Sequence, residues 1–314
     1  MDIDDIRIDG FAKYDAITVL NQKQKNVLFI DRRKNADILL IVLAGYKPYL
    51  YEDVFSRLRR FSYPNMDICL LSSGLFDIRL DKIASDNKWS YLATKRNCLP
   101  LIQNIAITLH PNAKFIYKMD EDIFLTKHCL PTLIETFKKV AQSDLYNIGF
   151  VAPLLPINGY GHVRILQKLG LTGVYEKKFE KVKYAAVSNR MIGASPDAAK
   201  FFWGEDGFIP SIDYMDEEFH KQDFKYGACP INFSIGLILM HRKIWEAMGG
   251  WRVPDEGSGM GQDEVQINQF CITYSFAMII SENTVAGHFS FGGQNEAMKE
   301  YYENHRKAFR YHAN

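Results

Sequence analysis

The chain repeats a pattern in which a short apolar run is followed by apolar residues at helical spacing. Residues 38–44 form a continuous aliphatic run that ends at a turn signal, residues 45–48. Apolar side chains at positions 51, 54, 55 and 58 then fall on one face of a predicted helix. This first unit therefore reads as a strand, a turn and a helix.

Further apolar runs predict strands over residues 67–71, 89–92, 114–119 and 148–152, with amphipathic segments between them. Strands that alternate with helices favour a parallel arrangement, because each crossover returns the chain to the same edge of the sheet. We predict an α/β fold with a mixed, mostly parallel central sheet that is flanked by helices.

The alternation is lost between residues 153 and 230, and a strand at 233–240, a helix at 242–248 and a strand at 276–280 then restore it. A long interruption inside a compact domain is typical of a functional elaboration, and its many aromatic residues argue against disorder. We interpret 153–230 as an insertion that covers the acceptor side of a binding crevice.

The predicted organisation has three parts. Residues 1–35 are a polar lead-in that packs on the main domain, residues 36–295 are that domain with its insertion at about 153–230, and residues 296–314 are a C-terminal helix.

The composition is that of an ordinary globular protein, with 47% hydrophobic and 24% charged residues and a formal net charge of +1. This balance offers no general field for nucleic acid, so we expect no nucleic-acid partner. The longest apolar runs fall well short of the roughly 20 residues that span a bilayer. The acidic start resembles no export signal, and the five scattered cysteines favour reduced thiols and a cytoplasmic location.

Two carboxylates interrupt the end of the apolar run 113–119, namely Asp120 and Asp122. Alternation along an extended backbone points both to the same side, and the carboxyl end of a buried strand faces the ligand crevice of an open α/β sheet. Two such carboxylates suit Mg²⁺ or Mn²⁺ that carries a diphosphate. The alternative is an ordinary turn or helix cap.

Small and polar residues at other strand ends, and Arg96 at a helix entrance, suit the phosphates and nucleoside of a nucleotide. The alternatives are simple turns and a solvated arginine. The residues that we expect to contact the nucleotide are Ala44, Tyr46, Ser73, Arg96 and Asp120, to which the family resemblance described below adds Gly250 and Trp251.

A glycine-rich segment, residues 256–261, leads into Asp263 and Glu264 at the start of another predicted helix. Glycine allows backbone states that a mobile lid requires, although an exposed loop is the plainer alternative. Asp263 stands at the predicted helix start, where a carboxylate is most often an N-cap. His288 follows the last predicted strand, and a lone histidine in such a place is most often a packed one.

In this order, these features resemble nucleotide-sugar glycosyltransferases of the GT-A fold, and the second half resembles the inverting β-1,4-galactosyltransferase type. The similarity covers roughly residues 37–295 in architecture, with close motif identity in short stretches only. The resemblance implies a GT-A catalytic domain and a nucleoside-diphosphate sugar donor, and UDP is the nucleotide that it favours. It also implies Mn²⁺ or Mg²⁺ held by Asp120, Asp122 and His288, and Asp263 as the base, with Glu264 as its nearest rival.

The chain also departs from that family. Gln262 stands where an acid is usual, Val285 stands where a methionine ligand is usual, and Gly259 stands where a tryptophan is usual. A membrane anchor is missing from the pattern. These departures leave the donor sugar open, and the resemblance implies a glycan or lipid-linked acceptor in surface polysaccharide synthesis, with peripheral contact at the inner membrane face.

Two other classes remain. A nucleotidyltransferase can use a similar fold and metal, but it would show a glycine-rich basic loop after the first strand, and residues 45–48 are poor in glycine. A sugar-binding or scaffold protein without activity could retain the fold, although it would not need the two acids, the late histidine and the acidic helix start.

Overall fold

The computed structural model describes residues 26–184 and 191–311, so most of the predicted lead-in lies outside the described part. The strands are β1 (Val27–Ile30), β2 (Ile38–Leu43), β3 (Asp67–Ser73), β4 (Ser90–Thr94), β5 (Phe115–Asp120), β6 (Ile123–Phe124), β7 (Ile148–Leu154), β8 (Tyr226–Ala228), β9 (Leu237–His241), β10 (Ala277–Val285) and β11 (Gly287–His288). The α-helices are α2 (Tyr51–Phe61), α3 (Ile78–Asn87), α4 (Leu99–Leu109), α5 (Cys129–Ser143), α6 (Gly161–Leu169), α7 (Thr172–Lys178), α8 (Met191–Ala194), α9 (Pro196–Phe202), α10 (Ile212–His220), α11 (Arg242–Ala247), α12 (Gln262–Thr273) and α13 (Asn295–Asn304). Three 3₁₀ turns lie at Pro48–Leu50, Gly292–Gln294 and Arg306–Ala308.

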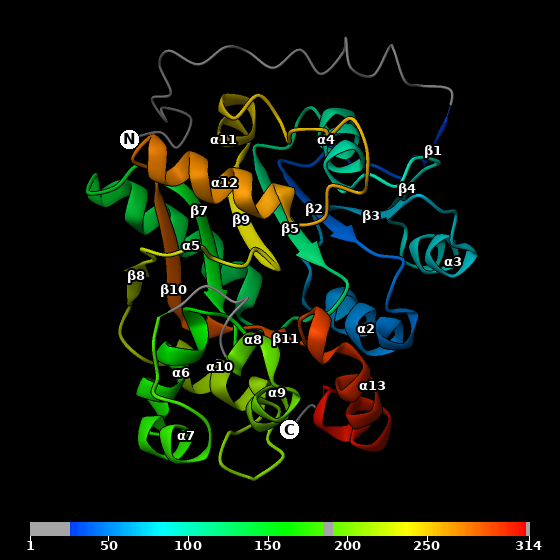
Figure 1. Ribbon diagram of the computed structural model, residues 1–314. Coiled ribbons are helices and arrows are strands. Elements are labelled where there is room, and N and C mark those ends of the chain that lie inside the picture. Colours follow the sequence, from blue (N-terminus) through cyan, green and yellow to red (C-terminus); the bar gives the residue numbers. More distant parts are fainter. Residues whose placement is uncertain (1–25, 185–190, 312–314) are drawn as a thin grey trace.

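Nine of these strands form one sheet in the order β1-β4-β3-β2-β5-β9-β7-β10-β8 (Figure 1). Strands β4, β3, β2, β5, β7 and β10 run in one direction, and β1, β9 and β8 run against them. The predicted α/β class, with a mostly parallel central sheet flanked by helices, is confirmed. The aliphatic sequence of β2 suits this position, because a central parallel strand is covered on both faces.

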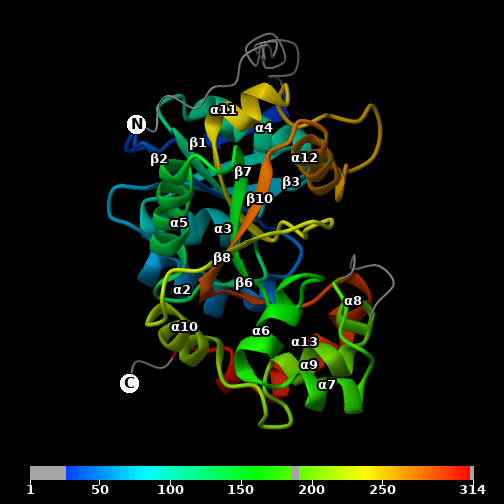
Figure 2. The same ribbon diagram turned by 90° about the vertical axis from the view of Figure 1, so that its left-hand side faces the viewer.

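Helices cover both faces of the sheet (Figure 2). Helix α5 packs on β7 and β10 from one side, while α4 and α12 lie on the other side. Helices α6 to α10 and α13 gather in the lower part of Figure 1, toward which the arrows of β2 and β5 point. The carboxyl ends of the central strands therefore meet a mainly helical layer.

Residues 153–230, predicted to be irregular, contain five short helices and strand β8 in their described part. Caps and breakers keep these helices short: Ser195 caps α9 and Ser211 caps α10, while Gly170 ends α6 in a left-handed conformation. These helices are only four to nine residues long, which is too short for a helical repeat to be recognised in the sequence.

The strand predicted at 233–240 is observed only as β9, residues 237–241. Residue 236 of the segment before β9 still contacts β5, because the Gly236 carbonyl accepts from the Asp120 N–H, but Phe233 bonds to a side chain: Asn268 accepts a hydrogen bond from the Phe233 N–H and donates one to the Phe233 carbonyl. The backbone groups of Phe233 are thus satisfied outside the sheet.

A second, two-stranded sheet joins β6 to β11, with Ile123 opposite His288 and Phe124 opposite Gly287. The Trp203 ring packs directly against this small sheet because residue 287 is glycine. A Cβ at this position would lie 2.6 Å from the ring of Trp203. This small sheet brings a residue near the end of the chain to the turn that follows β5.

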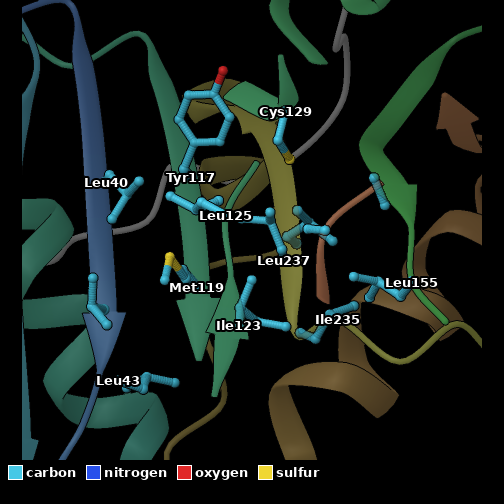
Figure 3. Packing of buried hydrophobic residues seen from close by; sticks show 14 of the residues in the cluster. Leu40, Leu43, Tyr117, Met119, Ile123, Leu125, Cys129, Leu155, Ile235 and Leu237 are labelled. Carbon is cyan, nitrogen blue, oxygen red and sulfur yellow. The ribbon is translucent and has the colours of Figure 1, made fainter. Parts of the chain in front are cut away.

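The core is continuous across the sheet. Figure 3 shows Tyr117 and Met119 of β5 in one layer with Leu40 of β2 and Leu237 of β9. The five cysteines are all free and buried, in agreement with the sequence prediction. Among the described residues, no helix is both long enough and apolar enough to cross a membrane.

Candidate active site

Strand β5 carries a buried lysine on the face opposite its apolar layer. Lys118 and Asp120 alternate with Tyr117 and Met119, and the Lys118 Nζ lies 2.7 Å from Asp120 Oδ1. It also donates to the Ile235 carbonyl at 3.0 Å and lies 3.9 Å from Asp263 Oδ2. Burial acts to lower the pKa of Lys118, but the two carboxylates outweigh it, the pKa is raised and the group remains a cation.

The Asp120 carboxyl is shared between this lysine and the crevice, with 35% of its side chain exposed. Desolvation by the surrounding protein raises its pKa to about 7, Lys118 opposes the shift, and Asp122 and Asp263 add to it. The raised pKa of Asp120 therefore reflects desolvation first and the two neighbouring carboxylates second.

Asp122 meets His288 across the small sheet. The Phe289 N–H donates to the Asp122 carbonyl, and Asp122 Oδ2 lies 4.0 Å from His288 Nε2. The other ring nitrogen of His288 lies 2.8 Å from the Ile157 carbonyl, which can only accept, so Nδ1 carries the hydrogen. Burial lowers the pKa of His288, the ring is neutral, and the lone pair of Nε2 faces Asp122.

This pair fits a divalent cation. Ligand atoms lie roughly 2.0–2.2 Å from ions of this class, so one ion can bridge a 4.0 Å separation. Over residues 26–184 and 191–311, no group of three or more His, Cys, Asp or Glu side chains is arranged to hold a metal. Asp122 and His288 would therefore supply two ligands and leave the other positions to phosphate oxygens and water.

A second lysine holds Asp122 in this structure. The Lys47 Nζ lies 2.5 Å from Asp122 Oδ2, and only 18% of the lysine side chain is exposed. Burial acts to raise the pKa of Asp122, but the ammonium outweighs it and the pKa is lowered. Each aspartate of the strand motif is thus paired with its own lysine.

The middle acid of the motif shapes the loop after β2. The Glu121 carboxylate accepts hydrogen bonds from the backbone N–H groups of Gly45, Tyr46 and Lys47, at 2.8 to 2.9 Å. Burial raises the pKa of Glu121, and these three donors oppose the shift. Such a row of N–H groups binds anions, and here a protein carboxylate already occupies it.

Three residues predicted to bind nucleotide lie together at the ends of β2 and β3. The Tyr46 hydroxyl donates to the Ser73 carbonyl at 3.2 Å, and the tyrosine is 51% exposed. Ser73 Oγ accepts from the Cys98 N–H at the start of α4, and the Ala44 N–H donates to Leu71. This edge of the sheet presents an accessible aromatic ring beside small residues.

The Arg96 side chain contacts the loop that precedes α12. Its guanidinium donates to the backbone carbonyls of Pro254 and Asp255. The Leu99 N–H donates to the Ser258 carbonyl at 2.8 Å, so α4 and the residues before it hold this loop both ahead of the glycine-rich segment and within it.

Gly250 and Trp251 also contact α4 and α12. Trp251 is only 1% exposed, and Asn104 binds its backbone N–H and carbonyl. Gln266 donates to the Gly250 carbonyl at 2.8 Å. The observed role of both residues is to fix the loop between the two helices.

Asp263 and Glu264 lie in the first turn of α12, as predicted, but Asp263 is not the N-cap. That position belongs to Gly261, with φ +75°, and no side chain caps the helix. Asp263 is 5% exposed, and its Oδ2 accepts from Gln103 at 3.0 Å. Glu264 is half-buried and accepts from Asn232 at 2.9 Å, and burial raises its pKa.

The sequence reasoning missed Lys47, Lys118, Glu121 and Gln103. A signal existed for Lys118, because a charged residue inside an apolar strand must have a buried partner, and Asp120 lies two positions on along the same face. Gln103 carried no such signal, since its partner Asp263 is 160 residues away.

No protein-family model matches the chain, and no curated protein matches it. Among solved structures, the fold is similar to the mannosyltransferase PcManGT from Pyrobaculum calidifontis, determined in complex with GDP-Man and Mn²⁺. The identity is 13% and the TM-score 0.49, over 85% of this chain and 61% of the length of that one. We therefore base the functional proposal on the geometry of the site.

Proposed function

We propose that the chain is a metal-dependent glycosyltransferase, which moves a sugar from a nucleoside-diphosphate donor to an acceptor hydroxyl with inversion at the anomeric carbon. One observation carries the proposal: carboxylates from the end of β5 and from the start of α12 converge on Lys118, beside the Asp122–His288 pair. Transfer needs these two functions in one site, a cation site for the diphosphate and a base for the acceptor.

The donor would lie along the ends of β2 and β3. The exposed ring of Tyr46 can stack on a nucleoside base, and Asn97 accepts from its hydroxyl at 3.1 Å and holds the ring in place. Because Glu121 occupies the N–H groups of the β2 loop, that loop cannot cradle the phosphates. The diphosphate would therefore extend to Asp122 and His288, where Mn²⁺ or Mg²⁺, when bound, neutralises the charge of the leaving group.

The start of α12 offers two candidate bases, and the geometry supports Glu264 over Asp263. A general base needs a pKa near the working pH and access to the acceptor. Glu264 is half-buried with a raised pKa, whereas Asp263 is enclosed, bonded to Gln103 and close to the Lys118 ammonium. Asp263 would then orient Lys118 and the helix start, and Glu264 would take the proton of the acceptor.

A panel of UDP-, GDP- and CDP-sugars, each with Mn²⁺ or Mg²⁺, tests the proposal. We expect slow, metal-dependent hydrolysis of one nucleotide class, with the sugar released by water in place of the acceptor. Proton NMR of the first product should show the inverted anomeric configuration. Absence of turnover across the whole panel would reject sugar transfer. A product that retains the anomeric configuration of the donor would reject inversion.

A further inference from the structure

We propose that Lys47 is an exchangeable counter-cation of the metal site: its ammonium occupies Asp122 before a divalent ion binds, and the ion displaces it toward the donor diphosphate. This inference rests on the proposed function, because it assigns Asp122 to the metal and the diphosphate to the same place. It adds a residue that neither the acidic motif nor its histidine partner includes.

The first observation is the position of the ammonium. The Lys47 Nζ contacts the same oxygen, Asp122 Oδ2, that faces His288 Nε2. A divalent cation that bridges this oxygen and the imidazole would lie within a few ångströms of the ammonium, and two positive charges so close repel strongly. Metal and ammonium therefore compete for one carboxylate oxygen.

The second observation is that the side chain can leave while its backbone remains. Glu121 fixes the backbone N–H of Lys47 at 2.9 Å, so the loop itself is held. The lysine side chain has a flexible four-carbon stem and is 18% exposed, which gives the ammonium a path out. The ammonium also lies 5.9 Å from the centroid of the Phe289 ring, a cation–π contact near the outer limit of the range and therefore weak.

The displaced ammonium would remain close to the leaving group. The loop that carries Lys47 also carries Tyr46, the proposed nucleoside contact, so the lysine lies between the nucleoside end and the metal end of the donor site. An ammonium is a strongly hydrated point charge with three donors, and it suits the oxygens of a diphosphate. One side chain would thus serve Asp122 in the empty site and the donor in the loaded site.

The test measures Mn²⁺ binding alone, without donor, by isothermal titration calorimetry. Lys47→Met keeps most of the stem and removes the charge, so the competitor disappears and we expect the Kd for Mn²⁺ to fall about tenfold or more. Lys47→Arg restores a cation and should return the affinity toward that of the wild type. Lys299→Met is the matched control, because it removes the same charge from an ammonium 5.5 Å from the centroid of the nearby Tyr49 ring, and it should leave the Kd within about twofold.

The second arm measures the nucleoside diphosphate product in saturating Mn²⁺. Lys47→Met should bind UDP or GDP about tenfold more weakly than the wild type, the reverse of its effect on the metal. A lysine that only supported the loop would weaken both ligands. Unchanged or weaker Mn²⁺ binding by a folded Lys47→Met variant overturns the proposal.

The outcomes also separate this inference from sugar transfer. Tighter Mn²⁺ binding by Lys47→Met together with no turnover of any nucleotide sugar would support the exchange and reject the transferase. If neither the wild type nor the variant binds Mn²⁺ or Mg²⁺, both the exchange and the metal site are wrong.

Discussion

The two aspartates of the strand motif have the same kind of partner in different settings. Asp120 pairs with Lys118, which projects from the sheet itself, is 4% exposed and also binds a backbone carbonyl and Asp263. Asp122 pairs with Lys47, which projects from a loop, is 18% exposed and makes its ion pair with Asp122 alone among the described residues. The first lysine is built into the sheet, and the second reaches the site from outside it.

The deeper burial and additional partners of Lys118 indicate that Lys47, and not Lys118, is the exchangeable cation. Removing Lys118 would leave the buried Asp263 and the partly exposed Asp120 without a counter-charge, so that lysine belongs to the scaffold. Removing Lys47 uncovers a single oxygen that a metal ion can take. The same residue pairing therefore stabilises the fold on one side of the motif and regulates access on the other.

The largest effect should come from breaking the Lys118–Asp120 ion pair. Lys118→Met should lower the free energy of unfolding by about 3–5 kcal/mol, because Asp120 and Asp263 lose a buried counter-charge. Urea denaturation at pH 7.5 measures the change. The control is Lys82→Met, which breaks an exposed pair with Asp86 and should cost less than about 0.5 kcal/mol. Equal losses in both variants would show that Lys118 is not part of the scaffold.

Removing the carboxylate of the Lys47–Asp122 ion pair should abolish metal binding without unfolding the chain. Asp122→Asn should reduce Mn²⁺ affinity and donor turnover on the order of a thousandfold, since the site loses its charged ligand. Asp120→Asn, the matched change in the Lys118–Asp120 ion pair, should reduce turnover only about tenfold. Titration calorimetry and a hydrolysis assay give both values, and the reverse ranking would contradict the assignment of the metal to Asp122.

Two variants at the start of α12 distinguish the proposed base, Glu264, from Asp263, which contacts Lys118. Glu264→Gln should reduce transfer about a hundredfold with unchanged Mn²⁺ affinity, because an amide cannot take the acceptor proton. Asp263→Asn should cost about tenfold, with a lower stability that reflects its contact with Lys118. Steady-state kinetics with a working acceptor would measure both. A larger loss in Asp263→Asn than in Glu264→Gln would return the role of base to Asp263.

The smallest expected effect concerns His162, a buried histidine outside both ion pairs, and the loss of folding stability that it causes at low pH. Burial lowers the pKa of His162 from 6.5 to about 4, so the unfolded chain binds more protons between these values and stability falls as the pH drops through this range. His162 should account for about 2 kcal/mol of the loss between pH 7 and pH 5. His162→Asn retains a donor toward the Asn158 carbonyl and should reduce the loss by this amount, as measured by urea denaturation. An unchanged loss would assign the acid sensitivity to other groups.

The pattern of neighbouring residues was enough to predict the central sheet and the acidic residues at the end of β5. The apolar runs of β2, β3 and β5 and the two acids after Met119 are read from neighbouring residues, and parallel strands place their ends at one edge. The fold class and the presence of acids at that edge followed from these facts.

Choices of partner between distant segments could not be read in this way. Lys47 selects Asp122 from 75 residues away, and Arg96 binds a loop more than 150 residues later. A sequence pattern fixes which face a side chain takes, whereas its partner depends on how separate elements pack. Trp251 illustrates the same limit, because its backbone bonds to Asn104, one of the few polar residues on the mostly apolar helix α4.

The burial of the five cysteines has a practical consequence. Burial raises the pKa of the Cys129 and Cys69 thiols far above neutrality, and it raises the pKa values of Cys229 and Cys271 to about 11 and about 12. Since the thiolate is the nucleophile, the folded chain should be almost inert to maleimide reagents. One cysteine introduced at the exposed Met260, within the glycine-rich segment that α4 contacts at Ser258, would then carry a fluorophore at a single known position and report directly whether that loop moves when a ligand enters.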